Sequence, residues 1–204
     1  MPVITTVPSA ILLDHQNVTH PATIVGDFVA IDKAIEAVVH FYHAIREAAA
    51  NTNSGEFWLQ LSAAATAAAA VDDFDTVGPF TTSTTQPANE ALNDAAGEPA
   101  GETQLAVTFV TGFAAKDKLY IEDLDAVGQS EWRYLQEVST HLVIVDGLTY
   151  AKAQNDMIWN GAEWWSMLLM VAPYNWMRCV YCHEGSTGAD TAIKVTYGLT
   201  MGVA

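Results

Sequence analysis

The chain has 204 residues, of which half are apolar and 16% are charged, with 24 acidic and 8 basic side chains. This length and composition indicate one globular domain, or one domain that carries a smaller insertion, and they exclude a disordered chain. The formal net charge of −16 repels nucleic acid and anionic lipid, so we expect neither a nucleic-acid nor a membrane partner. The sequence shows no signal peptide and no apolar run of roughly 18 residues, which predicts a soluble cytoplasmic product.

In the N-terminal third, most segments have strand character. Residues 2–8 alternate β-branched residues with prolines, which predicts an extended arm over residues 1–8 or an edge strand. A short apolar strand is expected at residues 10–13, a polar loop at 14–21, and a strand at 23–30 that bends at Gly26. Residues 57–61 are also expected to form a strand.

Residues 33–51 are ambiguous between helix and strand. Ile35, Val38, Tyr42 and Ile45 fit one face of a helix, and the alanines of this segment also favour a helix. Residues 38–42, however, have the β-branched and aromatic composition of a strand core. Local propensity alone slightly favours the helix.

The composition changes after the alanine-rich residues 63–70. Residues 72–102 are rich in Thr, Pro, Asn, Asp and Gly, which indicates a boundary. Strands at regular spacing follow, and such spacing is typical of a small all-β unit. They are expected at residues 104–110, 119–121, 131–138, 142–145 and 157–159, and further strands at 164–171, 176–183 and 192–201, the last two joined by a hairpin loop at 184–190.

Three sets of residues could carry chemistry, but a structural interpretation is favoured for each. Cys179, Cys182 and His183 have the letters of a haem-attachment motif, yet two residues three apart on a strand point to opposite faces, so we expect reduced cysteines used for packing. The same argument separates His40 from His43 unless they lie on a helix. The sequence Glu122-Asp123-Leu124-Asp125 lacks the calcium-loop pattern and is expected to be a solvated acidic face. We therefore expect no metal, no cofactor and no catalytic residue.

The six tryptophans leave several interpretations open. Tryptophans in strands are most often core residues, but a cluster can also form a subunit interface or a platform on which sugars stack. They are Trp58, Trp132, Trp159, Trp164, Trp165 and Trp176.

Four segments together resemble a known group of proteins. Residues 108–123 contain Gly-Phe followed by an aspartate and a Leu-Tyr-Ile strand, residues 130–132 read Ser-Glu-Trp, and residues 145–151 contain an Asp-Gly-Leu turn. This order, with the loop at 183–189, resembles virion structural proteins of tailed phages, capsid decoration (cement) proteins in particular. In those proteins a small β-module interrupts a sandwich.

The resemblance implies an all-β fold with two parts. Residues 1–71 and 160–204 are expected to build an antiparallel, jelly-roll-like sandwich, and residues 72–159 an inserted, acidic, small β-barrel-like domain. It also implies that residues 35–45 are a sandwich strand, against their local helix propensity.

The implied function is adhesion rather than catalysis. The chain is expected to bind the outer surface of the virion capsid after synthesis in the host cytoplasm, with the major capsid protein and itself, as a homotrimer, as partners. The expected contact residues are Val3, Ile4 and Val7 of the arm, together with Trp164 and Trp176. The alternatives are a head-fibre or tail-associated module that binds host carbohydrate through tryptophans, and an electron carrier that uses the two cysteines.

Overall fold

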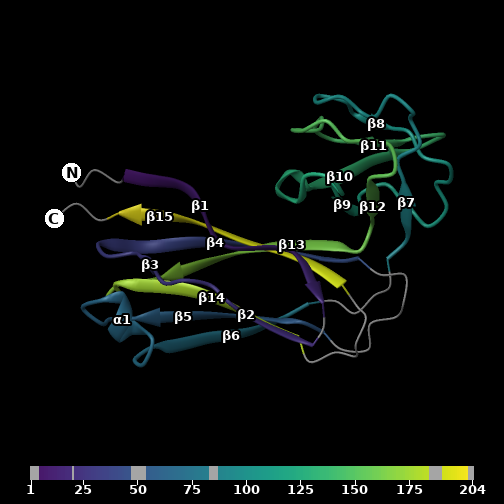
Figure 1. The fold of residues 1–204 in the computed structure, drawn as a ribbon. Coiled ribbons are helices and arrows are strands. Elements are labelled where there is room, and N and C mark those ends of the chain that lie inside the picture. Colours follow the sequence, from purple (N-terminus) through teal and green to yellow (C-terminus); the bar gives the residue numbers. More distant parts are fainter. Residues whose placement is uncertain (1–4, 20, 47–53, 83–86, 184–189, 202–204) are drawn as a thin grey trace.

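The computed structural model describes residues 5–19, 21–46, 54–82, 87–183 and 190–201 (Figure 1). Within these residues the protein is all-β, with one short helix, α1 (Ala67–Ala70), and one 3-10 turn (Val127–Gln129). No helix in this part of the chain has the length and apolar character needed to cross a membrane. The predicted fold class is confirmed: two antiparallel sheets pack as a sandwich, and a third, strongly curled sheet is attached to them.

The sandwich consists of two sheets whose strands come from both ends of the chain (Figure 1). Sheet A has the order β1 (Thr5–Thr19), β15 (Asp190–Met201), β4 (Ala34–Ile45) and β13 (Ala162–Met170). Sheet B has the order β2 (Ala22–Val25), β14 (Trp176–His183), β5 (Glu56–Ser62) and β6 (Asp75–Thr81), and β3 (Val29–Ala30) also pairs with β14.

The strand pairs are nested, which defines the sandwich as a jelly roll. The first strand, β1, pairs with the last, β15, and β2 pairs with β14. Inside these pairs β4 joins β13, and β5 joins β6. All four pairings are antiparallel, as in the double Greek key of jelly rolls.

The ambiguous segment is a strand, β4, as the resemblance implies. Ala37, Val39 and Phe41 are all fully buried in the core between the sheets, whereas Val38 and His40 alternate with them on the outer face. A helix would have divided these apolar side chains among several directions. Burial at a period of two therefore outweighs the helix propensity of the alanines.

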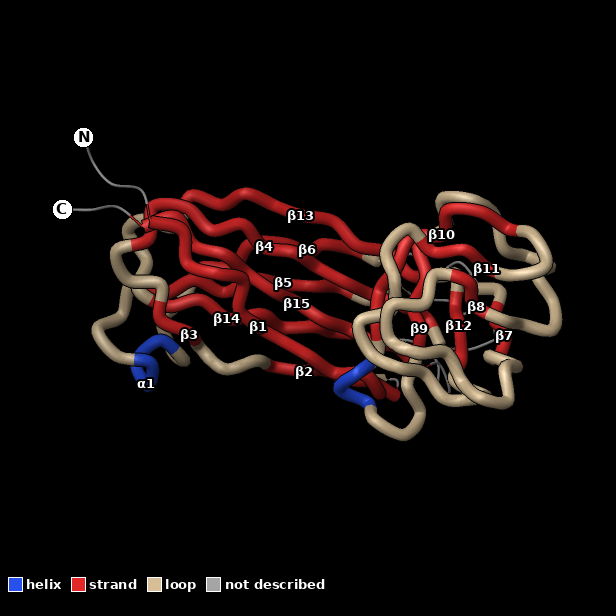
Figure 2. Tube along the Cα trace, turned by 90° about the horizontal axis from the view of Figure 1, so that it is seen from above, coloured by secondary structure: helices blue, strands red, loops and turns tan. Residues whose placement is uncertain are grey.

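The insertion forms one six-stranded sheet that curls into a half-barrel around its own core. Its strand order is β7 (Asn89–Ala91), β12 (Met157–Trp159), β9 (Lys118–Ile121), β10 (Glu131–Val138), β11 (Leu142–Ile144) and β8 (Gln104–Leu105). The half-barrel lies at one end of the sandwich, on the side of sheet A (Figures 1 and 2).

The structure corrects several predicted boundaries. Residues 75–81, predicted to belong to the insertion, form β6 and pair with β5, so they belong to sheet B. The Thr, Gly and Pro residues of this segment are typical of a loop, which is why the sequence does not predict a strand here. Val77 and Phe80 nevertheless pack on the sandwich core. The polar loop expected at residues 14–21 is wrong for Asp14–Thr19, which continue β1 because β15 offers them a pairing partner.

Two further predictions change at the ends of elements. The strand expected at residues 104–110 is only two residues long in β8, with one isolated bridge from Val107 to Leu92 beyond it. Thr5–Val7 pair with β15 as part of β1, which is an edge strand of sheet A, so the edge-strand alternative is confirmed for these residues. Residues 1–4 of the predicted arm lie outside the described residues. In the predicted hairpin loop, residues 184–189 also lie outside the described part.

Candidate functional site

Aromatic side chains connect the sandwich to the half-barrel. The ring of Tyr42 on β4 lies 5.4 Å from the ring of Trp132 on β10, and Trp132 lies 4.8 Å from Tyr120 on β9. On its other side Tyr42 lies 6.2 Å from Trp164 of β13, which meets Tyr134 edge-on at 4.5 Å. Offset and edge-on contacts of this kind stabilise an interface beyond the area that they bury.

Polar contacts reinforce this junction. Arg46 and Glu122 form an ion pair of 2.7 Å between the end of β4 and the residue that follows β9. The indole N–H of Trp159 donates to the second oxygen of Glu122 at 3.2 Å. Lys118 donates to the carbonyl oxygen of Trp164 at 2.8 Å, with its ammonium 4.8 Å from the Trp164 ring centroid. The two parts are thus joined by packing, charge and hydrogen bonds together.

The acidic cluster is not the solvated face that we expected. Glu122 and Asp123 are 7% and 6% exposed, and Asp125 alone of the three carboxylates faces solvent. Asp123 accepts hydrogen bonds from the backbone N–H groups of Asp125 and Ala126 and lies 3.6 Å from Lys152. The burial of these carboxylates could not be predicted from the sequence, because the cations that neutralise them, Arg46 and Lys152, lie at distant positions of the chain.

Glu131 belongs to the same buried ionic cluster, because Lys152 contacts it as well as Asp123. It accepts hydrogen bonds from the backbone N–H groups of Thr149 and Tyr150, at 2.8 and 3.0 Å, and contacts Arg133 and Lys152. Burial by itself would raise the pKa of Glu131, but these hydrogen bonds and the two cations outweigh it and lower the pKa. Glu131 is therefore an ionised structural anchor of the 149–150 loop.

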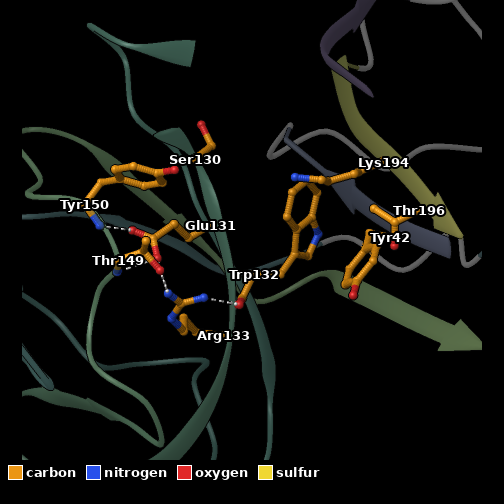
Figure 3. Close-up of a pocket in the computed structure, with 9 residues that line it drawn as sticks. All are labelled: Tyr42, Ser130, Glu131, Trp132, Arg133, Thr149, Tyr150, Lys194 and Thr196. Atoms are coloured by element: carbon orange, nitrogen blue, oxygen red, sulfur yellow. Dashed lines mark hydrogen bonds and ion pairs between the residues drawn. The ribbon is translucent and has the colours of Figure 1, made fainter. Parts of the chain in front are cut away.

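An open cleft of about 380 Å³ lies where the two parts meet (Figure 3). It is lined by residues of β4, β15, β10 and the loop after β11, namely Tyr42, Lys194, Thr196, Ser130, Glu131, Trp132, Arg133, Thr149 and Tyr150. In Figure 3 the indole of Trp132 separates the three sandwich residues from the charged residues of the half-barrel. The indole nitrogen of Trp132 is buried and has no hydrogen-bond partner in the part of the chain that the structure describes.

The cysteine motif has the arrangement expected of a strand. Cys179 is fully buried in the sandwich core, whereas Cys182 is half-buried and lies 3.5 Å from the hydroxyl of Thr23 on β2. Burial raises the pKa of Cys179, so that its thiol stays protonated at neutral pH. Both cysteines are free thiols, on opposite faces of β14, and His183 lies on the buried face with Cys179.

The two histidines also separate as expected for a strand. His40 lies on the outer face of β4, where its Nδ1 is 2.6 Å from the hydroxyl of Ser166. His43 is buried, with its two ring nitrogens each 3.3 Å from a partner, the carboxylate of Glu163 and the hydroxyl of Tyr181. Among the described residues, no group of three or more His, Cys, Asp and Glu side chains is arranged to hold a metal ion.

The predicted contact residues lie in different places. Val3 and Ile4 lie outside the described residues, and Val7 pairs with Leu199 in sheet A. Trp164 belongs to the aromatic junction described above, and Trp176 donates from its indole nitrogen to the carbonyl oxygen of Ala64 at 3.0 Å. The three of them that the structure describes thus lie on three different strands, β1, β13 and β14. Of the six tryptophans, Trp159 is buried and the other five are half-buried.

No known protein family, curated protein or solved structure matched this chain in three separate comparisons. The function is accordingly inferred from the residues of the chain itself.

Proposed function

We propose that this chain is a structural protein of a tailed-phage virion that adheres to the outer surface of the capsid as a decoration protein. The observation that carries the proposal is the strand edge of β13, which the half-barrel contacts at Trp164 and which is exposed at Leu168 and Met170. Jelly-roll proteins have many different functions, so the fold alone does not indicate this one. The proposal rests instead on the surface of the sandwich.

β13 lies at the edge of sheet A, and among the described strands it pairs with β4 alone (Figure 2). Its nine residues pair with β4 in one unbroken register. The stretch from Trp164 to Met170 contains no charged residue, and the side chains of Leu168 and Met170 are 62% and 63% exposed. A long, regular and apolar edge of this kind is a template on which another chain can add a strand.

The other three edges of the sandwich are interrupted. β6 contains Gly78-Pro79 and a register shift against β5. β1 contains Pro8 and three register shifts against β15, and the remaining edge is divided into β2 and β3 at residues 26–28. Bulges, prolines and breaks prevent edge-to-edge association in natural sheets, so the continuous edge of β13 is a distinct feature of this molecule.

The residues behind the resemblance have architectural roles, which supports a structural protein. Glu131 anchors the 149–150 loop, Trp132 packs between the two parts, and Leu148 is buried. Asp117 accepts a hydrogen bond from the backbone N–H of Ala114 within its turn. In the proposed role, many copies of β13 would contact capsid proteins or neighbouring copies, and their combined contacts would stabilise the shell.

The test uses capsids of the phage that encodes the chain, stripped of this protein. Purified protein is expected to co-sediment with them, and Leu168→Lys is expected to reduce the bound amount severalfold, because a lysine on an edge opposes strand addition. Leu124→Lys is the matched control, since Leu124 is 53% exposed in the half-barrel. Sedimentation equilibrium is expected to give three times the chain mass of 22.0 kDa. Failure of the wild-type protein to bind the capsids would contradict the proposal.

A further inference from the structure

We propose that the outer face of sheet B docks onto a capsid protein that presents a carboxylate among apolar side chains. The inference rests on the proposed capsid adhesion, and it adds a contact surface separate from the edge of β13. Figure 1 shows the half-barrel on the side of sheet A, so the half-barrel leaves the outer face of sheet B uncovered.

The outer face of sheet B carries an apolar row. Val25, Val180 and Trp58 lie side by side on β2, β14 and β5, because Val180 pairs with both of the others. Val25 is 52% exposed, and the indole of Trp58 extends towards β6, where a Cβ at Gly78 would lie 3.3 Å from its Cε3 atom. The solvent-facing side of an antiparallel sheet is ordinarily polar. A continuous apolar row on that side indicates a protein contact surface.

Arg178 lies beside this row and is held in a fixed position. Its guanidinium carbon lies 4.3 Å from the ring centroid of Phe28 and 5.4 Å from that of Phe74. Its Nε donates to Oε1 of Gln60 at 2.6 Å, and no other nitrogen of this side chain has a hydrogen-bond partner among the described residues. The two terminal nitrogens are not buried, so a carboxylate can accept two parallel hydrogen bonds from them.

The charge of Arg178 lacks a counterion within the described chain. The other two arginines, Arg46 and Arg133, each form an ion pair with a glutamate, whereas no described carboxylate forms one with Arg178. Partial burial lowers the pKa of Arg178, since it removes water from the cation. A partner's carboxylate would compensate this charge. A polyanion is repelled by the net charge of −16, but a single carboxylate among apolar side chains matches both Arg178 and the apolar row.

The test measures the protein concentration that half-saturates capsids stripped of this protein. Arg178→Glu is expected to raise that concentration about tenfold or more, because repulsion of the partner's carboxylate replaces attraction. Lys116→Glu is the matched control, since it changes the net charge equally at an exposed position of the half-barrel.

A second variant tests the apolar row without removing Arg178 or its ring contacts. Val25→Asp is expected to raise the half-saturating concentration about three- to tenfold, because it adds a carboxylate and removes an apolar contact. Ile11→Asp is its control, since Ile11 is 56% exposed on β1 of sheet A. Both control variants are expected to bind as the wild type does.

Photo-crosslinking identifies what covers the face. With p-benzoylphenylalanine in place of Val25, the expected product joins this chain to a capsid-protein peptide that contains Asp or Glu. Cross-links only to another copy of this chain, or only to capsid peptides without Asp and Glu, would overturn the inference. Wild-type binding by Arg178→Glu or by Val25→Asp would overturn it too, and capsid adhesion itself would stand. If the wild type did not bind capsids, both proposals would fall.

Discussion

Arg46 and Glu122 form a 2.7 Å ion pair that joins the sandwich to the half-barrel. Arg46 follows β4, a central strand of sheet A, and Glu122 follows β9 at the centre of the curled sheet. Their side chains are only 11% and 9% exposed, and Trp159 donates a hydrogen bond to the same carboxylate. Because two elements of the half-barrel and one of the sandwich meet at Glu122, this residue orients the insertion.

Glu122→Gln is therefore expected to weaken the junction. The neutral amide loses the ion pair with Arg46, and its one acceptor oxygen can accept from only one of Arg46 and Trp159, so we expect a loss of about 2 kcal/mol in the free energy of unfolding. Urea unfolding followed by tryptophan fluorescence measures the change. Glu137→Gln is the matched control, since Glu137 is an exposed residue of β10. Equal urea midpoints for the two variants would show that the pair does not stabilise the junction.

The ammonium group of Lys152 is fully buried and compensates the negative charge of two buried carboxylates. Its ammonium lies 3.2 Å from Glu131 and 3.6 Å from Asp123 and donates to the carbonyl oxygen of Gln129 at 2.7 Å. Lys152→Met would leave two buried carboxylates with less compensation, so a loss of about 3–5 kcal/mol is expected. Circular dichroism during thermal unfolding measures it, with Lys33→Met, at an exposed position, as the control. A Tm unchanged by Lys152→Met would contradict this role.

Stability is expected to fall in acid because of Glu131. The folded state holds the pKa of Glu131 below its ordinary value of 4.5, so the carboxylate's contribution is fully present above pH 4.5 and disappears as the pH falls through the lower, folded pKa. The effect of Glu98 on stability in acid has the opposite sign. Burial raises the pKa of Glu98, so its protonation favours the folded state. Comparison of the wild type with Glu131→Gln isolates the first effect.

The measurement is the free energy of unfolding between pH 2.5 and 6, obtained from urea titrations. The wild type is expected to lose stability more steeply below pH 4.5 than Glu131→Gln, whose neutral side chain has no proton to gain. Parallel curves for the two proteins would mean that Glu131 does not link folding to protons in this range.

The strands with aromatic and β-branched alternation could be predicted from the sequence to the residue. β10, β12 and β14 have the predicted bounds, and in β14 the side chains alternate strictly between a buried and a more exposed face. β6 could not be predicted, since Gly78 and Pro79 disfavour a strand and only pairing with β5 imposes one.

The candidate site could not be predicted, because it depends on contacts between distant segments. Tyr42 and Trp132 are 90 positions apart in the sequence, and their rings are in contact because the insertion packs against sheet A. The burial of Glu122 and Asp123 has the same origin, since Arg46 and Lys152 are remote in sequence. Local patterns describe which face of an element is apolar, but they do not say which other element covers it.

Thiol labelling tests the arrangement of the two cysteines on β14. Cys179 is fully buried and its pKa is raised by burial, so it should not react with a water-soluble maleimide in the folded protein. Cys182 is half-buried and should react slowly. Mass spectrometry is expected to find one label, on Cys182, under native conditions and two after unfolding in urea, with Cys182→Ser as the control that loses the native label. Native labelling of Cys179 would contradict the packing of this strand.

The Asp146-Gly147-Leu148 turn provides a test of why glycine stands there. A Cβ at Gly147 would lie 2.5 Å from the carbonyl oxygen and 2.8 Å from the carbonyl carbon of Gly101, and neither atom can move away as a side chain would. Two backbone hydrogen bonds hold the segments together, from Gly101 to Leu148 at 2.8 Å and from Leu148 to Glu102 at 2.9 Å. Gly147→Ala must therefore push the segments apart.

We expect Gly147→Ala to lower the free energy of unfolding by about 1–3 kcal/mol. Gly128→Ala is the control, because a Cβ at Gly128 would meet nothing within 4 Å, and we expect no loss or a gain of up to about 1 kcal/mol there. Urea midpoints with unchanged m-values measure both effects. If Gly147→Ala were as stable as the control, the turn would tolerate any residue, and its glycine could no longer be explained by the close approach of residue 101. The expected difference instead ties one motif of the resemblance to a steric requirement of the half-barrel.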